Sequence, residues 1–206
     1  MKARSAKSSW NRRPAAGWCS SASQVAHTLH SEQGILESLD WAVRAPRAAA
    51  FLSTLVEDVA AVLKRDPASR LAWRTVPLDI YASLPAGIAS SWVFVLRAGC
   101  SSGAERHPNS IQRVMSYRGW ADMRTWNGER WISNRLRSDP DDKLEQRWLS
   151  IPANTWHRPV MGDVDWAVVS FHTASDTALI EELPLDDECP DRGSRAAEVY
   201  AGRQAR

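Results

Sequence analysis

The sequence predicts a mainly β protein, an antiparallel β-barrel or jelly roll that follows an α-helical N-terminal extension. From about Leu71 to Pro184 the chain consists of short apolar or alternating runs broken by turn residues, which is typical of antiparallel β structure. Ahead of that region, residues 46–65 carry apolar side chains at helical spacing. About eight strands with a polar, convergent set facing inward suit a small barrel, and such barrels enclose a ligand cavity.

Length and charge limit the classes of protein to which the chain can belong. With 206 residues, we expect one domain with an appendage. The net charge of +2, from 26 basic and 24 acidic residues, leaves no electrostatic footprint for nucleic acid. No run of about 18 apolar residues occurs, which argues against a membrane span. Cys19, Cys100 and Cys189 lie far apart and are odd in number, so we expect a reduced, cytoplasmic protein.

The region before the barrel divides into a tail and a helical extension. Residues 1–31 are rich in Ser, Ala and Arg and lack a continuous apolar core, so we expect a disordered tail or an over-extended start site rather than a secretory signal. In the extension, residues 32–70, we expect a short helix over 32–43. A stronger helix over 46–65 begins at a proline and ends at Asp66-Pro67. Its broad apolar stripe either packs on the barrel or joins a second subunit, and we expect a homodimer.

The barrel, residues 71–184, contains eight candidate strands. Asn127-Gly128 predicts a hairpin between two of them, and residues 138–143 predict an exposed loop. After Pro184 we expect a polar tail, residues 185–206, with one helical turn at 194–200. The candidate strands are Asp79–Ser83, Ser91–Arg97, Ala104–His107, Gln112–Arg118, Asp122–Trp126, Arg130–Leu136, Gln146–Ile151 and Asp165–Thr173.

Polar residues cluster in the stretch between Gly99 and Gly119. Glu105 and His107 are two apart, so on a strand they share a face, about 6.6 Å apart along the backbone. The turn at 108–110 then reverses the chain and brings Gln112 close to both. A second histidine, His157, follows another turn further along the chain. This convergence suits a metal ion or a small polar ligand.

These two stretches resemble the two motifs of the cupin superfamily. The first family motif reads Gly, five residues, His-x-His, three or four residues, Glu, six residues, Gly. This chain keeps every spacing, with Glu105 in place of the first His and Gln112 in place of the Glu. The second motif reads Gly, five residues, Pro-x-Gly, two residues, His, three residues, Asn. Pro152 and His157 fit it at the right spacing, while Gln146, Asn154 and Met161 replace its first Gly, its second Gly and its final Asn. The resemblance, over roughly residues 75–184, implies the cupin barrel.

Two histidines and one carboxylate give a coherent ligand set for a metal. Glu105, His107 and His157 together suit Fe(II), with Mn, Ni, Co and Zn as alternatives. Gln112 adds a neutral oxygen ligand or a hydrogen bond to a bound water. Because exchanging His for Glu and Glu for Gln leaves one carboxylate, the formal charge of the set matches the family pattern. In the alternative, Glu105 and Gln112 hydrogen-bond each other or His107 in a metal-free barrel.

Four other residues are candidates for the site. His172 lies on the last strand and is an acid/base group or fourth ligand if its face points inward, or else a satisfied core histidine. Arg118, which alternation places on the face of Gln112, and Arg124 are candidates to hold a substrate carboxylate, although exposed, salt-bridged arginines are the commoner case. Trp126, one of 11 tryptophans, either helps to wall an apolar pocket or fills the core.

The resemblance implies a metal-dependent enzyme acting on a small organic molecule. By analogy with the family, a dioxygenase comes first, followed by a lyase or an isomerase, but the fold alone does not fix the reaction. The alternative is a non-catalytic, metal-free barrel that binds or senses a small molecule. No phosphate loop, Cys-x-x-Cys pair or nucleophile–His–Asp signature appears in the sequence. The substrate itself is not named by any motif.

Overall fold

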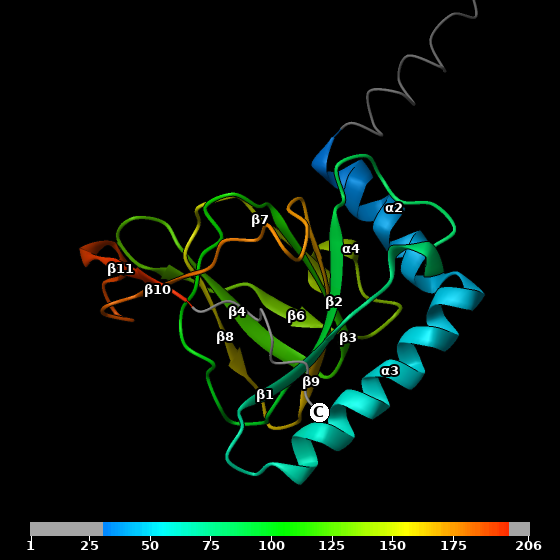
Figure 1. Ribbon diagram of the computed structural model, residues 1–206, viewed down its shortest axis with the longest axis horizontal. Coiled ribbons are helices and arrows are strands. Elements are labelled where there is room, and N and C mark those ends of the chain that lie inside the picture. Colours follow the sequence, from blue (N-terminus) through cyan, green and yellow to red (C-terminus); the bar gives the residue numbers. More distant parts are fainter. Residues whose placement is uncertain (1–30, 198–206) are drawn as a thin grey trace, which may run out of the picture.

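The computed structural model describes residues 31–197 of the chain. The expected N-terminal tail, apart from Ser31, and residues 198–206 of the expected C-terminal tail lie outside the described residues. Within them, two long helices lie along one side of a β-barrel, and a small hairpin lies at its far end (Figure 1). The predicted class, a mainly antiparallel β fold with N-terminal helices, is confirmed.

Two helices form the N-terminal extension, α2 (Glu32–Arg44) and α3 (Pro46–Arg65). The Ser31 hydroxyl accepts a hydrogen bond from the backbone N–H of Gly34 at 3.1 Å and so caps α2. Pro46 occupies the first turn of α3, where a missing N–H leaves no bond unmade. The prediction for α3 is confirmed, and α2 ends one residue later than predicted. No described helix is long and apolar enough to cross a membrane.

The apolar stripe of α3 packs on the protein's own barrel. Each fully buried Leu or Val in such a stripe contributes about 1.5–3 kcal/mol to folding. Since the stripe is covered by strands β1 (Leu71–Thr75) and β2 (Ser90–Leu96) of the same chain, it does not require a second subunit, and the homodimer stays a prediction. The side chains of α3 that are buried are Ala48, Leu52, Val56, Val59 and Leu63.

The barrel consists of two facing antiparallel sheets. The first has the order β1-β2-β9-β3-β7, with bounds Leu71–Thr75, Ser90–Leu96, Trp166–His172, Gln112–Arg118 and Trp148–Ile151. In the second, β4 pairs with three neighbours, and the members are β4 (Trp120–Trp126), β5 (Trp131–Ile132), β6 (Arg135–Arg137) and β8 (His157–Met161). The separate hairpin joins β10 (Glu182–Pro184) to β11 (Ser194–Ala196).

Alternation along the strands of the first sheet separates two cores. Val93 and Val169 belong to a cluster that faces the helices. Val114 and Val168 belong to a second cluster inside the barrel, shared with the second sheet. Because successive side chains of a strand point to opposite faces, the even-numbered residues of β2, the start of β3, and β9 line the barrel interior. Gln112, on β3, therefore faces inward.

Several of the predicted strand boundaries are wrong. Residues 79–83 lie instead in and after a short 3₁₀ helix, Leu78–Ile80, and the first strand is β1, which was not among the candidates. The candidate at 146–151 begins with a short helix, α4 (Leu144–Arg147), and becomes strand only at Trp148. The helical turn expected at 194–200 begins instead as strand β11. A second 3₁₀ helix, Pro190–Arg192, lies just before that strand.

Two further candidate strands are less regular than predicted, and one predicted hairpin is present. The candidate at 130–136 is split into β5 and β6, because the Asn134 amide donates to the backbone oxygens of Met123 and Ile132. The candidate at 104–107 makes only isolated bridges, including Glu105 with His157 and Arg106 with Glu182. The Asn127-Gly128 hairpin is present, since β4 pairs with β5.

Candidate metal centre

The backbone holds Glu105 and His157 directly opposite each other. The Glu105 N–H donates to the His157 carbonyl, and the His157 N–H donates to the Glu105 carbonyl, each at 2.9 Å. The next residue, Arg106, exchanges the same pair of bonds with Glu182 of β10 at 3.0 Å. The carbonyl of His107 accepts from the Asn154 N–H at 2.9 Å. Strand β8, strand β10 and the turn before β8 thus fix the backbone of the segment that carries Glu105 and His107.

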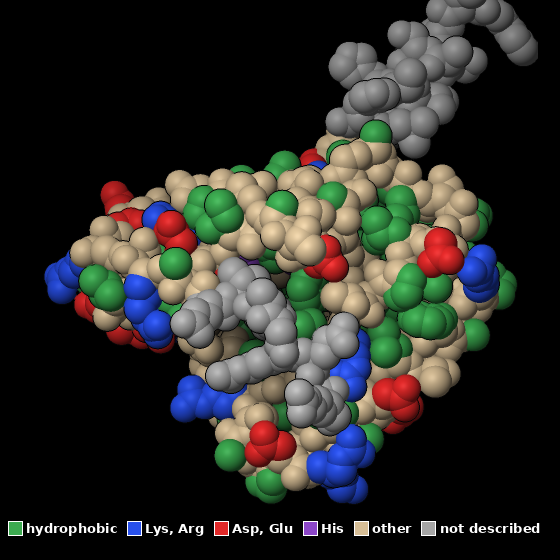
Figure 2. All heavy atoms as spheres, viewed as in Figure 1, with side chains coloured by type: hydrophobic (Ala, Val, Ile, Leu, Met, Phe, Trp, Pro, Cys, Tyr) green, Lys and Arg blue, Asp and Glu red, His purple; other side chains and the backbone are tan. Residues whose placement is uncertain are grey.

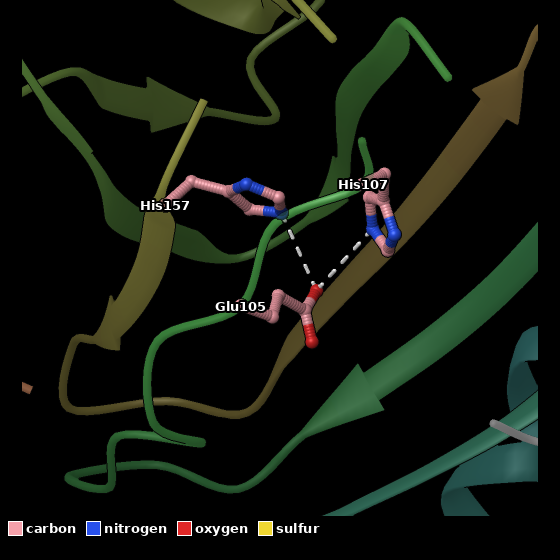
Figure 3. Close-up of side chains that lie close together, drawn as sticks. All are labelled: Glu105, His107 and His157. Carbon is pink, nitrogen blue, oxygen red and sulfur yellow. Dashed lines mark ion pairs between the residues drawn. The ribbon is translucent and has the colours of Figure 1, made fainter. Parts of the chain in front are cut away.

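Three side chains converge at this point (Figure 3). The Glu105 Oε1 atom lies 3.4 Å from His157 Nε2 and 3.9 Å from His107 Nε2. One ligand atom from each residue lies within 4.8 Å of the other two. Donor atoms held at about 2.0–2.2 Å from one metal ion lie roughly 3.0–3.5 Å apart, so Glu105 Oε1 and His157 Nε2 already fit and His107 Nε2 has to move closer. Small side-chain rotations are therefore enough to bind an ion.

The hydrogen bonds of the two imidazoles set their tautomers. His107 Nδ1 lies 3.2 Å from the carbonyl of Ile180, and His157 Nδ1 lies 3.0 Å from the carbonyl of Thr155. A carbonyl oxygen can only accept, so each Nδ1 carries a proton, and in the neutral ring Nε2 then keeps its lone pair. His157 Nε2 is buried and makes no hydrogen bond. Histidines that ligate metals are oriented in this way.

The charges of the cluster also suit a metal. Burial by itself raises the pKa of Glu105, but the His157 and His107 imidazoles outweigh it and hold that pKa below its usual value. Burial lowers the pKa of His107 to about 4, so the ring is neutral at pH 7. A carboxylate beside neutral imidazole is the protonation state in which these groups bind metal.

A buried row of polar groups lies next to the cluster. Gln112 Nε2 donates to Ser170 Oγ at 3.2 Å, and Ser170 Oγ lies 3.1 Å from His172 Nε2. His172 is buried and meets the His107 ring edge-on, with 5.0 Å between centroids. Burial lowers the pKa of His172 well below its usual value, so this ring is neutral too. His172 is not part of the three-residue cluster. The Gln112 Oε1 atom is buried and has no hydrogen-bond partner.

Glu105 and Gln112 share a small cavity between the two sheets. Its volume is about 40 Å³, room for about three water-sized groups. Most of its wall is apolar, and of the three cluster residues Glu105 is the one that lines it. The residues that line it are Leu71, Phe94, Leu96, Ser102, Glu105, Gln112, Val114, Met123, Pro159, Trp166, Val168 and Ser170.

The structure does not bring Arg118 to this cavity. A β-bulge between Ser116 and Arg118 shifts the register of β3 against β9, so that Arg118 pairs with Ala167 instead of continuing the inward face. The Arg118 guanidinium is half-exposed and pairs with Glu57 of α3 at 2.7 Å. Alternation across β3 therefore misplaces this arginine.

Arg124 and Trp126 also lie outside the cavity. Met123 of the same strand lines the cavity, so its even-numbered neighbours face outward. Arg124 donates to Asp122 at 2.8 Å, and the Trp126 indole donates to Asp191 at 2.7 Å. On the face shown in Figure 2, acidic and basic side chains are interspersed rather than gathered by sign.

Sequence reasoning missed two polar residues near the cluster. Ser170 orients Gln112 and lies in phase with His172 on β9, so alternation alone could have indicated it. Glu181 is buried, and burial together with the Glu105 charge raises its pKa to about 8. It follows Ile180, whose carbonyl holds His107. Nothing in the spacing of the motifs signals Glu181.

Two motif positions adopt backbone conformations that explain the family pattern. Gly119 has φ of +80°, and a Cβ there would lie 2.6 Å from the Asp165 carbonyl oxygen, so only glycine fits. Asn154 has φ of 64° and stands where the family has glycine. Asparagine is among the residues that best tolerate this region. The turn before His157 is therefore kept despite the substitution.

Comparison with solved structures finds cupin proteins. Oxalate oxidase in complex with the substrate analogue glycolate shares 14% identity, with a TM-score of 0.41 over 53% of this chain and 54% of that one. The capsular polysaccharide assembling protein CapF from Staphylococcus aureus shares 16%, with a TM-score of 0.40 over 51% of this chain and 26% of that one. Pumpkin seed globulin shares 19%, with a TM-score of 0.42 over 55% and 28%.

The likeness to these cupin structures is distant in both identity and TM-score. Both motif spacings fall on the facing sheets of the barrel, and the residues at the ligand positions converge, as the resemblance implied. The chain spans about a quarter to a half of the length of those neighbours. No family model matches its sequence, and no curated protein matches it. Such distant likenesses leave the activity open, since one fold hosts many functions.

Proposed function

We propose that this protein is a metal-dependent enzyme of the cupin type that acts on a small organic molecule, with Glu105, His107 and His157 as the metal ligands. One observation carries the proposal: a carboxylate oxygen and two imidazole Nε2 atoms meet inside the barrel, within 4.8 Å of one another. Both Nδ1 atoms are bonded to carbonyls, so both Nε2 lone pairs are available. A buried Nε2 with no hydrogen-bond partner is costly unless a ligand completes it.

The donor set favours Fe(II) among the divalent metals. Two histidines and one carboxylate are typical of non-haem Fe(II) oxygenases, and Mn, Ni, Co and Zn also bind such donors. When bound, the metal supplies Lewis-acid or redox chemistry at positions left open by three protein ligands. Glu105 supplies the negative charge of the set, and the two histidines orient it. We therefore propose a dioxygenase as the reaction class, followed by a lyase or an isomerase.

A non-catalytic barrel is the second candidate. The proximity of Glu105 Oε1 to both Nε2 atoms favours it, because a shared proton between a carboxylate and an imidazole also holds such a cluster together. That reading assigns Gln112 and Glu105 to a metal-free site for a small polar molecule. The solved neighbours include both an oxalate oxidase and a seed globulin, so the fold is compatible with either class.

Metal content and oxygen uptake separate the two candidates. The protein is loaded anaerobically with Fe(II), and in parallel with Mn, Ni, Co and Zn, dialysed at pH 7.5 and analysed for metal. The enzyme proposal expects about one ion per chain for at least one of these metals, and near none in a His157→Ala variant. The absence of any bound metal in the wild-type protein would leave the non-catalytic barrel. Oxygen uptake by the Fe(II) form with candidate substrates then tests the dioxygenase class.

The remaining proposals concern the setting of the protein. The two described cysteines, Cys100 and Cys189, are free thiols, which supports the proposal of a reducing, cytoplasmic environment. A small molecule is the proposed partner, because the cavity beside Glu105 is enclosed between two sheets. Fractionation of cells that express the native chain tests the compartment.

A further inference from the structure

The carbonyl oxygen of the Gln112 side chain is an unused acceptor at the wall of the cavity. Gln112 is buried, lines the cavity together with Glu105, and its Oε1 atom has no hydrogen-bond partner. Buried polar atoms in folded proteins are nearly always paired, so an acceptor left over in a cavity indicates a missing donor. The donor belongs to whatever molecule occupies the cavity.

Two neighbours on β9 set the orientation of this amide. Gln112 Nε2 donates to Ser170 Oγ, so the amide is anchored through its nitrogen and Oε1 is turned away from Ser170. Ser170 Oγ in turn forms a hydrogen bond of 3.1 Å with His172 Nε2, which holds the hydroxyl in place. Ser170 and His172 are therefore positioning residues, and Gln112 is the group that meets the ligand.

The rest of the cavity wall limits the chemistry of that ligand. None of the described lining residues is a Lys, Arg or His, so no cationic side chain on the wall is available to hold a second anionic group. The Trp166 indole N–H is already donated to Ser116 Oγ at 2.8 Å, so its ring presents only apolar surface. Val114, Met123 and Val168 complete an apolar surface opposite the polar end. This wall accepts a short hydrocarbon group.

The charge of the metal site and the size of the cavity further restrict which ligands can bind. A divalent ion with one carboxylate ligand, Glu105, retains one net positive charge, which a single carboxylate on the ligand neutralises. The cavity of about 40 Å³ admits only a small ligand, in which the metal-facing group and the partner of Gln112 are at most a few atoms apart. A hydroxyl group satisfies Oε1 without changing the ligand's charge, whereas an ammonium group would leave the site positive.

We propose, building on the proposed metal centre, that the site binds a small 2-hydroxycarboxylate with a short apolar substituent, and that Gln112 selects it by accepting its hydroxyl proton in a hydrogen bond. The carboxylate meets the metal held by Glu105, His107 and His157. The substituent packs on the apolar wall around Val114 and Val168. A 2-oxo acid of the same size lacks the O–H and leaves Gln112 Oε1 unpaired.

Binding of two matched probes tests the inference. Lactate and pyruvate each carry a methyl group and one carboxylate. At C2 lactate has a hydroxyl group, which can donate a hydrogen bond, and pyruvate has a keto oxygen, which can only accept one. Titration calorimetry with Zn-loaded protein, in which no redox turnover occurs, is expected to show lactate binding about tenfold or more tighter than pyruvate, because sites built to bond a hydroxyl reject analogues that lack it. In Gln112→Met, which keeps an unbranched side chain without the amide, the preference is expected to fall to within about twofold.

Metal analysis of the same samples separates the two proposals. If wild-type protein holds no metal, the proposed function falls and the inference falls with it. If metal is bound but neither acid binds, or pyruvate binds as tightly or tighter, the inference alone is overturned. An unchanged preference in metal-loaded Gln112→Met also overturns it. Arg124→Ala, on the outer face of β4, serves as the control and keeps the wild-type preference.

Discussion

Glu105 and His157 are paired twice, once through their backbones and once through their side chains. Their main chains exchange two hydrogen bonds of 2.9 Å, and Glu105 Oε1 lies 3.4 Å from His157 Nε2. A ladder pair of this kind fixes the distance between the two Cβ atoms, so the donor atoms meet without any adjustment of the barrel. The placement of two of the three proposed ligands is therefore a property of the backbone pairing rather than of a mobile loop.

Loss of one imidazole should remove the metal and leave the fold. His157→Ala is expected to weaken metal binding by more than about 100-fold, which exceeds the loss usually seen when only an outer partner of a ligand is removed. Circular dichroism should retain the β spectrum, since the His157 backbone bonds remain. Arg124→Ala is the matched control and should bind metal as the wild type does. Metal binding in His157→Ala that equals the control would contradict the ligand assignment.

Substitution of Gln112 should reduce metal affinity less than substitution of any of the three proposed ligands. Gln112→Ala is expected to change metal affinity by no more than about tenfold, because an amide oxygen suits these ions less well than imidazole or carboxylate. Gln112→Glu should tighten binding, since it adds a second negative charge next to the ion. Competition with a chromophoric chelator measures both. A loss in Gln112→Ala as large as that in His157→Ala would show that the amide is a principal ligand.

The buried neutral histidine should make the metal-free protein less stable in mild acid. His107 has a pKa of about 4 when folded, against about 6.5 when unfolded, so the unfolded state takes up the proton first as pH falls. Its contribution to stability is present above pH 6.5 and is lost as the pH falls from about 6.5 to 4. We expect the free energy of unfolding to drop by about 2–3 kcal/mol from this source between pH 7.5 and 4.5.

Urea unfolding in the presence of a chelator checks this pH dependence. His107→Asn removes the titrating group, so the free energy of unfolding of this variant should depend less on pH over the same range. At the steepest point, the slopes of the two curves should differ by the uptake of roughly one proton. The comparison uses the difference between the two curves, which cancels the contribution of groups common to both proteins. Parallel curves for wild type and His107→Asn would contradict the neutral, buried state of His107.

A second ionic cluster should stabilise the junction between the helices and the barrel. Asp40 of α2 accepts hydrogen bonds from the Arg147 guanidinium and, at 2.8 Å, from the Trp148 indole. Burial raises the pKa of Asp40, but Arg147, Trp148 and Arg44 together lower it below its usual value. Its stabilisation is therefore complete above about pH 4 and is lost as the pH falls through the lowered pKa.

Neutralising this carboxylate tests the junction. Asp40→Asn is expected to cost about 3 kcal/mol at pH 7, because it leaves the buried Arg147 charge without its partner. The matched control is Asp79→Asn, whose pair with Arg47 is exposed and 4.0 Å long, and whose effect should stay within about 0.5 kcal/mol. Chemical denaturation measures both. If the two substitutions lowered the free energy of unfolding equally, Asp40 would not stabilise the junction as proposed.

The spacing of the motifs predicted the barrel and the three converging ligands because that spacing reflects strand geometry. Glu105, His107 and His157 lie on turns and bridges whose residue counts are fixed by the two sheets. Asn154 keeps the left-handed turn that glycine provides in the family pattern, so His157 stays in place. The substituted positions did not disturb the pattern because the backbone requirements were still met.

Irregularities of the backbone explain what the sequence could not predict. The bulge at Ser116–Arg118 reverses the face of Arg118, and nothing in local periodicity announces it. Strand β8 begins at His157 and was not among the candidate strands; it contains Pro159, a residue type that is rare inside strands. The unpaired Gln112 Oε1 depends on Ser170, a contact between residues far apart in the chain.

Anomalous diffraction from crystals of the metal-loaded protein, recorded at the absorption edge of the bound metal, tests the metal centre most directly. A site built from this cluster predicts one strong peak between Glu105 Oε1, His107 Nε2 and His157 Nε2, at about 2.0–2.2 Å from each atom. A peak elsewhere on the protein, or none at this cluster in crystals that elemental analysis shows to contain the metal, would contradict it.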